Sequence, residues 1–102
     1  MNEHLVSKLL ALTEPLAALS ICHLTATTRQ KLADDDLSVN VYPNDYGGFV
    51  YVGTEPYNVP MESDMAMIFE LAKMAGIVWL KFDCDAAILD GLPVFEDPDN
   101  DL

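Results

Sequence analysis

The sequence predicts a small α+β domain in which a mixed sheet of three to four strands carries two to three helices, packed mainly on one face. Three observations support this prediction. Apolar residues at helical spacing end at Gly76, and an apolar run over residues 77–85 follows at once. Residues 37–42 alternate between apolar and polar side chains, as a half-buried strand does. A chain of 102 residues has room for one core built from such elements.

The N-terminal third predicts a helix, a strand and a second helix. Leucines and a valine recur at helical spacing over residues 3–13, and Pro15 follows, which indicates a short amphipathic helix. The mostly apolar run over residues 16–23 predicts a buried strand. Thr25 suits the cap of a short helix at residues 27–33, which should end at three aspartates because carboxylates are unfavourable at a helix C-terminus.

The middle of the chain predicts a hairpin and then the longest helix. Residues 37–42 and 49–52 read as its two strands, joined by a turn over residues 43–48 that is rich in Pro, Asn, Asp and Gly. An irregular connection follows over residues 53–60. Ser63 can cap the next helix, whose apolar side continues until Gly76 ends it.

The C-terminal part predicts a central strand and little regular structure after it. The strand covers residues 77–85, and residues 86–90 favour a helical turn. Residues 94–96 fit a short edge strand. We therefore expect one globular domain over residues 1–96 and a mobile acidic tail over residues 97–102.

The charge balance restricts the class of partner. Seventeen Asp and Glu against five Lys and Arg give a formal net charge of −12 and a pI near 4.1. Such a field repels nucleic acid and anionic membranes and favours a basic protein or cations. The chain has no basic leader and no apolar segment of membrane-spanning length, and Cys22 and Cys84 are too few for a zinc site. We expect a cytoplasmic protein with reduced cysteines and no cofactor.

Two carboxylates and a histidine are the candidates for chemistry. Asp83 and Asp85 would project from one side of an extended strand and could bind Mg²⁺ or Mn²⁺, or act as acid and base. His23 would meet them if the first and last strands were parallel neighbours. The structural alternative stays open, because such carboxylates also solvate a strand end, and a buried His often pairs with a carboxylate.

Three segments carry a family resemblance. They are Ser20-Ile-Cys-His-Leu-Thr25, Asp45-Tyr-Gly-Gly-Phe-Val-Tyr51, and Trp79-Leu-Lys-Phe-Asp-Cys-Asp-Ala86 followed by Gly91-Leu-Pro93. Together they resemble a family of short bacterial proteins of unknown function that occur on plasmids, prophages and genomic islands. The resemblance covers roughly residues 16 to 96 and implies one domain in a mobile-element setting. It implies no activity.

Charge and resemblance together favour a non-enzymatic interaction protein. It would dock on a basic, nucleic-acid-handling defence or restriction protein and inhibit or modulate it by charge mimicry. The predicted partner-binding residues are Asp34, Asp35, Asp36, Asp45, Tyr46, Glu55, Tyr57, Glu62 and Asp64. One alternative is a small metal-assisted or acid/base enzyme that uses His23, Asp83 and Asp85. Another is an antitoxin-like or oligomeric structural component, in which tyrosines of the hairpin would be buried in a homodimer.

Overall fold

A computed structural model describes residues 2–53 and 59–95, and it confirms the predicted α+β fold with a four-stranded mixed sheet. The elements in chain order are α1 (Glu3–Leu10), β1 (Leu16–Ser20), the 3₁₀ turn η1 (Ile21–His23), α2 (Ala26–Ala33), β2 (Val41–Asn44), β3 (Gly47–Tyr51), α3 (Ser63–Ala75) and β4 (Trp79–Asp83). The strand order is β1-β4-β3-β2. β1 runs parallel to β4, whereas β4 with β3 and β3 with β2 are antiparallel.

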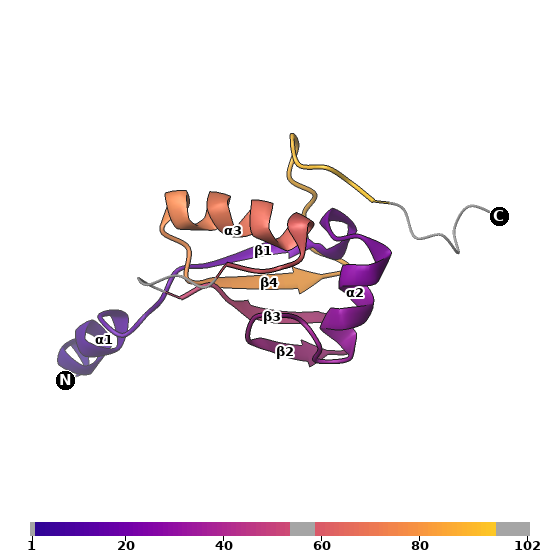
Figure 1. Cartoon of the computed structure of the whole chain (residues 1–102). Helices are drawn as coiled ribbons and strands as arrows, with labels where there is room; N and C mark the ends of the chain where they lie inside the picture. Colours follow the sequence, from indigo (N-terminus) through magenta and orange to yellow (C-terminus); the bar gives the residue numbers. More distant parts are fainter. Residues whose placement is uncertain (1, 54–58, 96–102) are drawn as a thin grey trace.

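One face of the sheet is covered and carries the core (Figure 1). Side chains alternate along each strand, so Val50, Leu80 and Phe82 all point to this face and are buried. α3 lies along the same face and contributes its own buried side. α2 adds Leu32, and η1 leads into Leu24, which has no exposed surface. The buried residues of α3 are Met65, Ile68, Phe69 and Ala72.

Of the two capping residues predicted for α3, the structure confirms the one at its C-terminal end only. Gly76 stands just after the helix with a positive φ of 73°, as predicted, since glycine enters the left-handed region without steric cost. The prediction that Ser63 caps the helix is wrong. Ser63 is the first helical residue, and Glu62 holds the capping position with its side chain turned to other partners.

Three predicted strands are too long. The strand predicted at residues 16–23 ends at Ser20, whose hydroxyl oxygen accepts from the Cys22 backbone N–H and starts η1. Of residues 37–42 only the last two belong to β2, which continues to Asn44 and leaves a two-residue turn before β3. The Asn44 side chain accepts from the Tyr46 backbone N–H, a local bond that closes the turn. The strand predicted at residues 77–85 is confined to β4.

The segment after β4 contains no helix or strand over residues 84–95, so the helical turn predicted at residues 86–90 is wrong. Isolated backbone hydrogen bonds hold this segment: the Phe95 N–H donates to the Cys22 carbonyl at 2.7 Å, and the Ser20 N–H donates to the Ala87 carbonyl at 2.9 Å. Val94 and Phe95 are not in a strand, so the edge strand predicted at residues 94–96 does not form at these two residues. Several predictions lie outside the described residues: residue 96, the tail over residues 97–102, and the partner-binding residues Glu55 and Tyr57.

Candidate functional site

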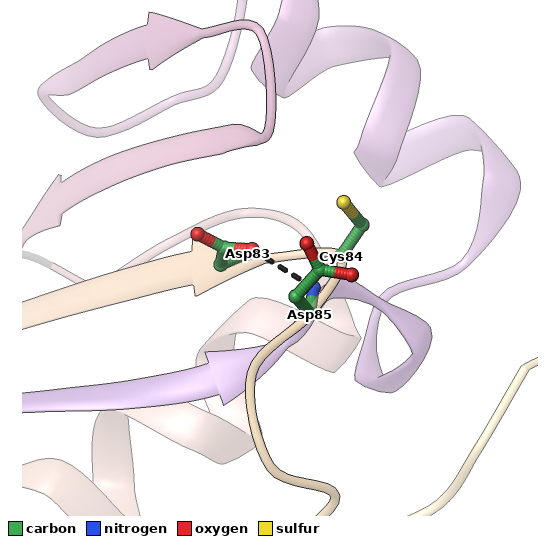
Figure 2. A group of neighbouring side chains, drawn as sticks. All are labelled: Asp83, Cys84 and Asp85. Carbon is green, nitrogen blue, oxygen red and sulfur yellow. Dashed lines mark hydrogen bonds between the residues drawn. The ribbon is translucent and has the colours of Figure 1, made fainter.

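Asp83 is the last residue of β4, and Cys84 and Asp85 lie in the turn that follows the strand (Figure 2). The Asp83 Oδ1 atom accepts from the Asp85 backbone N–H at 2.8 Å, which makes Asp83 the first residue of a local turn. The Ala86 N–H then donates to the Asp83 carbonyl at 3.2 Å. The expectation that both carboxylates project from one side of a strand is therefore wrong, because the strand ends between them.

These three residues form a cluster with limited capacity to bind a metal ion. One ligand atom from each lies within 4.8 Å of the others. Cys84 and Asp85 are exposed, and all three donors come from consecutive residues of one turn. Asp83 already accepts from the Asp85 backbone, and its Oδ2 lies 3.9 Å from the Lys81 ammonium. An ion here would compete with that ammonium and would keep most of its water.

His23 is buried, and both nitrogens of its ring are engaged by the backbone. Its Nδ1 lies 2.9 Å from the Pro93 carbonyl, and its Nε2 accepts from the Leu89 N–H at 2.9 Å. This pair of bonds assigns the proton to Nδ1. The imidazole thus ties the segment after β4 to the end of η1, and neither nitrogen is left to act as a base.

β1 and β4 are parallel neighbours, yet His23 does not meet the aspartates. The small cavity beside His23 is lined by Asp64, Ile68, Pro93 and other residues on the α3 side, and Asp83 and Asp85 are not among them. Asp83 shares its side of β4 with Trp79 and Lys81, on the face that α3 does not cover. His23 thus lies on the α3 side and Asp83 on the other face of β4, while Asp85 lies in the turn beyond the strand, so the residues of the enzyme alternative do not form one site.

Exposed carboxylates gather instead at the end of the sheet where β4 stops and the β2–β3 hairpin turns. A surface cleft of about 220 Å³ there is lined by Ala33, Asp45, Tyr46 and Cys84, among others. The Cys84 N–H donates to the Tyr46 carbonyl at 2.9 Å, which joins the hairpin turn to β4. Asp34, Asp35 and Asp36 follow directly after Ala33 and are all exposed. We call the exposed carboxylates of Asp34, Asp35, Asp36, Asp45 and Asp85 the acidic end.

Two of the predicted partner-binding carboxylates serve the fold. Asp64 accepts from the Thr25 N–H at 2.9 Å, from the Thr28 hydroxyl at 2.8 Å and from the Met65 N–H at 2.9 Å. It thereby joins the start of α2 to the start of α3. Glu62 accepts from the Ser38 hydroxyl at 2.6 Å and from the Ser38 N–H at 3.2 Å, and its side chain is 8% exposed. Neither carboxylate is presented to solvent as those of the acidic end are.

Burial and hydrogen bonding act in opposite directions on Glu62. Desolvation is the largest single effect and raises the pKa of its carboxyl group. The hydrogen bonds from Ser38 and the Lys31 ammonium, 3.8 Å away, lower the pKa, and together they outweigh desolvation, so the net pKa is below the ordinary value. A pKa that is lower in the folded state means that the unfolded state binds the proton more readily. Ionised Glu62 therefore stabilises the fold above its unfolded pKa, and this contribution is lost as the pH falls through the folded pKa.

We expect Glu62→Gln to lower the free energy of unfolding by about 1 kcal/mol at neutral pH, because charge-assisted bonds to Ser38 are weakened. The loss should shrink as the pH falls below the ordinary glutamate range, since the wild-type carboxylate then protonates too. Urea denaturation at several pH values measures this difference. Ser38→Ala, which removes the hydroxyl donor, should show the same trend, and a loss that grows in acid would contradict the assignment.

Sequence reasoning missed the residues that receive these carboxylates. Thr28 and Ser38 carry ordinary hydroxyls, and nothing in their neighbourhood along the chain marks them as partners of residues 36 and 24 positions away. Arg29 was also missed; its guanidinium donates to the Leu24 and Phe95 carbonyls and so fixes η1 and the C-terminal segment to α2. The Thr25 and Thr28 spacing, with a hydroxyl capping the third following N–H, was the one available signal.

Comparison with known proteins gives one match. A family model described as the C-terminal domain of a family of unknown function, DUF5983, matches residues 16–97. The match begins at the first residue of β1 and leaves α1 outside. No curated protein and no solved structure matches the chain. Among the described residues, no helix is both long and apolar enough to span a lipid bilayer.

Proposed function

The chain belongs to the DUF5983 family, whose function is unknown, and we propose that it acts without enzymatic chemistry, as an acidic interaction protein that docks onto a basic protein. The observation that carries this proposal is the acidic end. Carboxylates from the turn after α2, the β2–β3 hairpin and the turn after β4 are exposed near one cleft: Asp45 lines it, and so do Ala33 and Cys84, the chain neighbours of Asp34 and Asp85. Arg29 is also among the lining residues. Such clustering raises the local negative potential above what the net charge of −12 alone would produce.

A nucleic-acid-handling protein is the class of partner that this surface fits best. Proteins of that class present Lys and Arg to phosphate groups, and closely spaced exposed carboxylates offer those cations a substitute for phosphates. The resemblance of three segments to proteins of bacterial mobile elements favours a partner in host defence or restriction. Docking would then occupy its nucleic acid site and inhibit or modulate it.

The proposal leaves His23 and Asp83 in structural roles. The imidazole is saturated by the backbone of residues 89 and 93, and the Asp83 carboxylate closes a turn and faces Lys81. Tyr46 stays in the docking surface because it is 60% exposed and lines the cleft beside Asp45. An exposed tyrosine next to carboxylates adds contact area with few rotors to order.

Variants in which carboxylates are replaced by neutral amides test the acidic end. Asp34→Asn with Asp45→Asn removes two charges there, whereas Glu70→Gln with Asp90→Asn removes two exposed charges from α3 and the segment after β4. We expect immobilised protein to capture basic nucleic-acid-binding proteins from a bacterial lysate at about 0.05 M salt, and capture to fall several-fold for the first variant only. The difference should vanish near 1 M salt, where the screening length is about 3 Å.

Competition decides whether the surface acts as a phosphate substitute. Excess double-stranded DNA should release the captured proteins, because it competes for the same cationic site. Three results would count against the proposal: captured proteins that are not basic, an amount of captured protein that does not change with ionic strength, or an equal loss of capture in the two double variants.

A further inference from the structure

The face of the sheet opposite α2 and α3 carries an exposed apolar surface. Leu16, Tyr42, Phe49 and Trp79 line a shallow depression of about 360 Å³, and Tyr51 packs beside them with its ring centroid 4.8 Å from that of Trp79. Tyr42 is 57% exposed and Leu16 is 46% exposed. No described helix lies over this face, which we call the open face. Aromatic side chains gathered on an uncovered sheet indicate a surface that another element covers.

α1 is an amphipathic helix whose apolar side has no surface to pack against, since none of its residues is buried. It projects away from the sheet beyond the start of β1 (Figure 1). The side chains of Leu5, Val6, Leu9 and Leu10 are between 52% and 67% exposed. A helix of eight residues is marginal in water by itself, so α1 needs a surface against which its apolar side can pack.

The connection to β1 holds α1 away from the open face of its own chain. The Pro15 carbonyl accepts from the N–H groups of Val78 and Trp79 at 3.0 and 3.1 Å. The Glu14 carboxylate accepts from the Trp79 indole N–H at 3.1 Å. Before this anchor, the Thr13 N–H and hydroxyl both donate to the Leu10 carbonyl, and Pro15 restricts Glu14 to extended backbone. These contacts fix the direction in which α1 leaves β1, and that direction points away from the sheet of its own chain (Figure 1).

Charge and size both fit a second copy. Residues 2–13 carry Glu3 and Lys8 and are formally neutral, so the net charge of −12 belongs to the rest of the chain, and α1 approaches another acidic copy without net repulsion. An eight-residue helix is about 12 Å long and about 10 Å wide. Four strands at about 4.8 Å spacing make a face about 14 Å across, which accommodates one such helix.

We infer that the chain forms a two-fold symmetric dimer in which α1 of each copy packs on the open face of the other. Leu5 and Leu9, one turn apart, enter the depression beside Tyr42 and Trp79 of the second copy. The exchange is reciprocal, so each dimer contains the same contact twice. The acidic ends stay exposed, because the depression lies among residues 16, 42, 49 and 79 and shares none of the cleft residues.

Two single substitutions test the helix side and the sheet side of the contact one at a time. Leu9→Asp damages the helix side of the contact, and Tyr42→Asp damages the sheet side; both residues are exposed, so folding should survive. We expect the wild type to sediment as a dimer at about 10 μM and above, and each variant to dimerise at least about a hundredfold more weakly, since every dimer loses two contacts. Met74→Asp, 81% exposed on α3, adds the same charge elsewhere and should leave the dimer intact.

Mixing the two damaged variants identifies the mode of pairing. A mixed dimer keeps one intact contact, the normal α1 of the Tyr42→Asp copy on the normal sheet of the Leu9→Asp copy, so mixing should restore dimers. Pairing of α1 with α1 would not be restored. The single tryptophan, Trp79, reports on the open face, and its emission should shift to the red in Leu9→Asp as the ring becomes hydrated.

Each contrary result overturns the exchange. A wild type that stays monomeric at 100 μM or so, with Trp79 emission that changes in Leu9→Asp, would show α1 packing on its own chain. A monomer whose emission ignores Leu9→Asp would show that α1 does not reach the open face. A dimer that survives both substitutions, or that mixing fails to restore, would place the interface elsewhere.

Discussion

Gly47→Ala is expected to lower the free energy of unfolding by at least about 3 kcal/mol, a large share of a total that for small domains is about 5–15 kcal/mol. A Cβ atom at Gly47 would stand 2.1 Å from the Phe82 carbonyl oxygen and 2.8 Å from its carbon. Both are backbone atoms of the adjacent strand, so no side-chain rotation relieves the conflict. The pairing of β3 with β4 would have to open at the hairpin, which also anchors Cys84.

Gly76→Ala is the matched control for that substitution. Gly76 has a φ of 73°, and an added Cβ would meet nothing within 4 Å. Its cost is therefore the backbone strain of a left-handed alanine, about 1 kcal/mol. Urea unfolding of both variants measures the difference, which reports what the contact with Phe82 and the φ of 150° at Gly47 add to the strain of an ordinary left-handed alanine. Equal losses would mean that β3 and β4 do not approach each other as closely as this register requires.

The parts of the fold that the sequence predicted are those set by side-chain periodicity and by glycine. α3 and Gly76 were found because a long apolar side ends at a residue with free access to positive φ. The parallel neighbours β1 and β4 were anticipated as a condition for the site. The helix and its terminal glycine are recorded locally in the chain, within one or two turns, whereas the pairing of β1 with β4 joins distant segments and no local pattern specifies it.

Strand ends were predicted less well, because single side chains close turns against the pattern. Ser20 ends β1 by capping η1, and Asp83 ends β4 by accepting from the Asp85 N–H. Both residues continue an apolar run, so periodicity extends the strand past them. A short polar side chain that competes for its own backbone is visible in the sequence, but its choice between strand and turn is decided by neighbours distant in the chain.

The candidate site shows the same division between local and distant information. Exposed aspartates after α2 and in the hairpin turn were predicted from composition and turn chemistry; the structure leaves them exposed, and Asp45 lines a cleft that also includes Ala33, the residue before Asp34. Glu62 and Asp64 were placed with them because charge alone does not distinguish a docking carboxylate from a structural one. Their partners, Ser38 and Thr28, are identified only once the chain is folded.

Asp64→Ala is expected to lower the free energy of unfolding by about 3 kcal/mol, because hydrogen bonds to a carboxylate contribute about 1.5–3 kcal/mol and their loss leaves donors unpaired. The Thr25 N–H at the start of α2 and the hydroxyl of Thr28, a buried residue, would both lose their acceptor. Asp64→Asn keeps one acceptor oxygen and should lose less. Asp90→Ala, an exposed carboxylate in the segment after β4, should stay within about 0.5 kcal/mol of the wild type.

This substitution also decides between the two roles of Asp64. If the carboxylate serves the fold, capture of a basic partner by Asp64→Ala should fall only in proportion to the unfolded fraction, and cooling or an osmolyte that restores folding should restore capture. If it serves docking, stability should be unchanged while capture falls, as for the Asp34 and Asp45 variant. Because both carboxylate oxygens accept hydrogen bonds within the fold, from Thr25, Thr28 and Met65, we expect the first result, measured by urea denaturation and salt-dependent capture on the same samples.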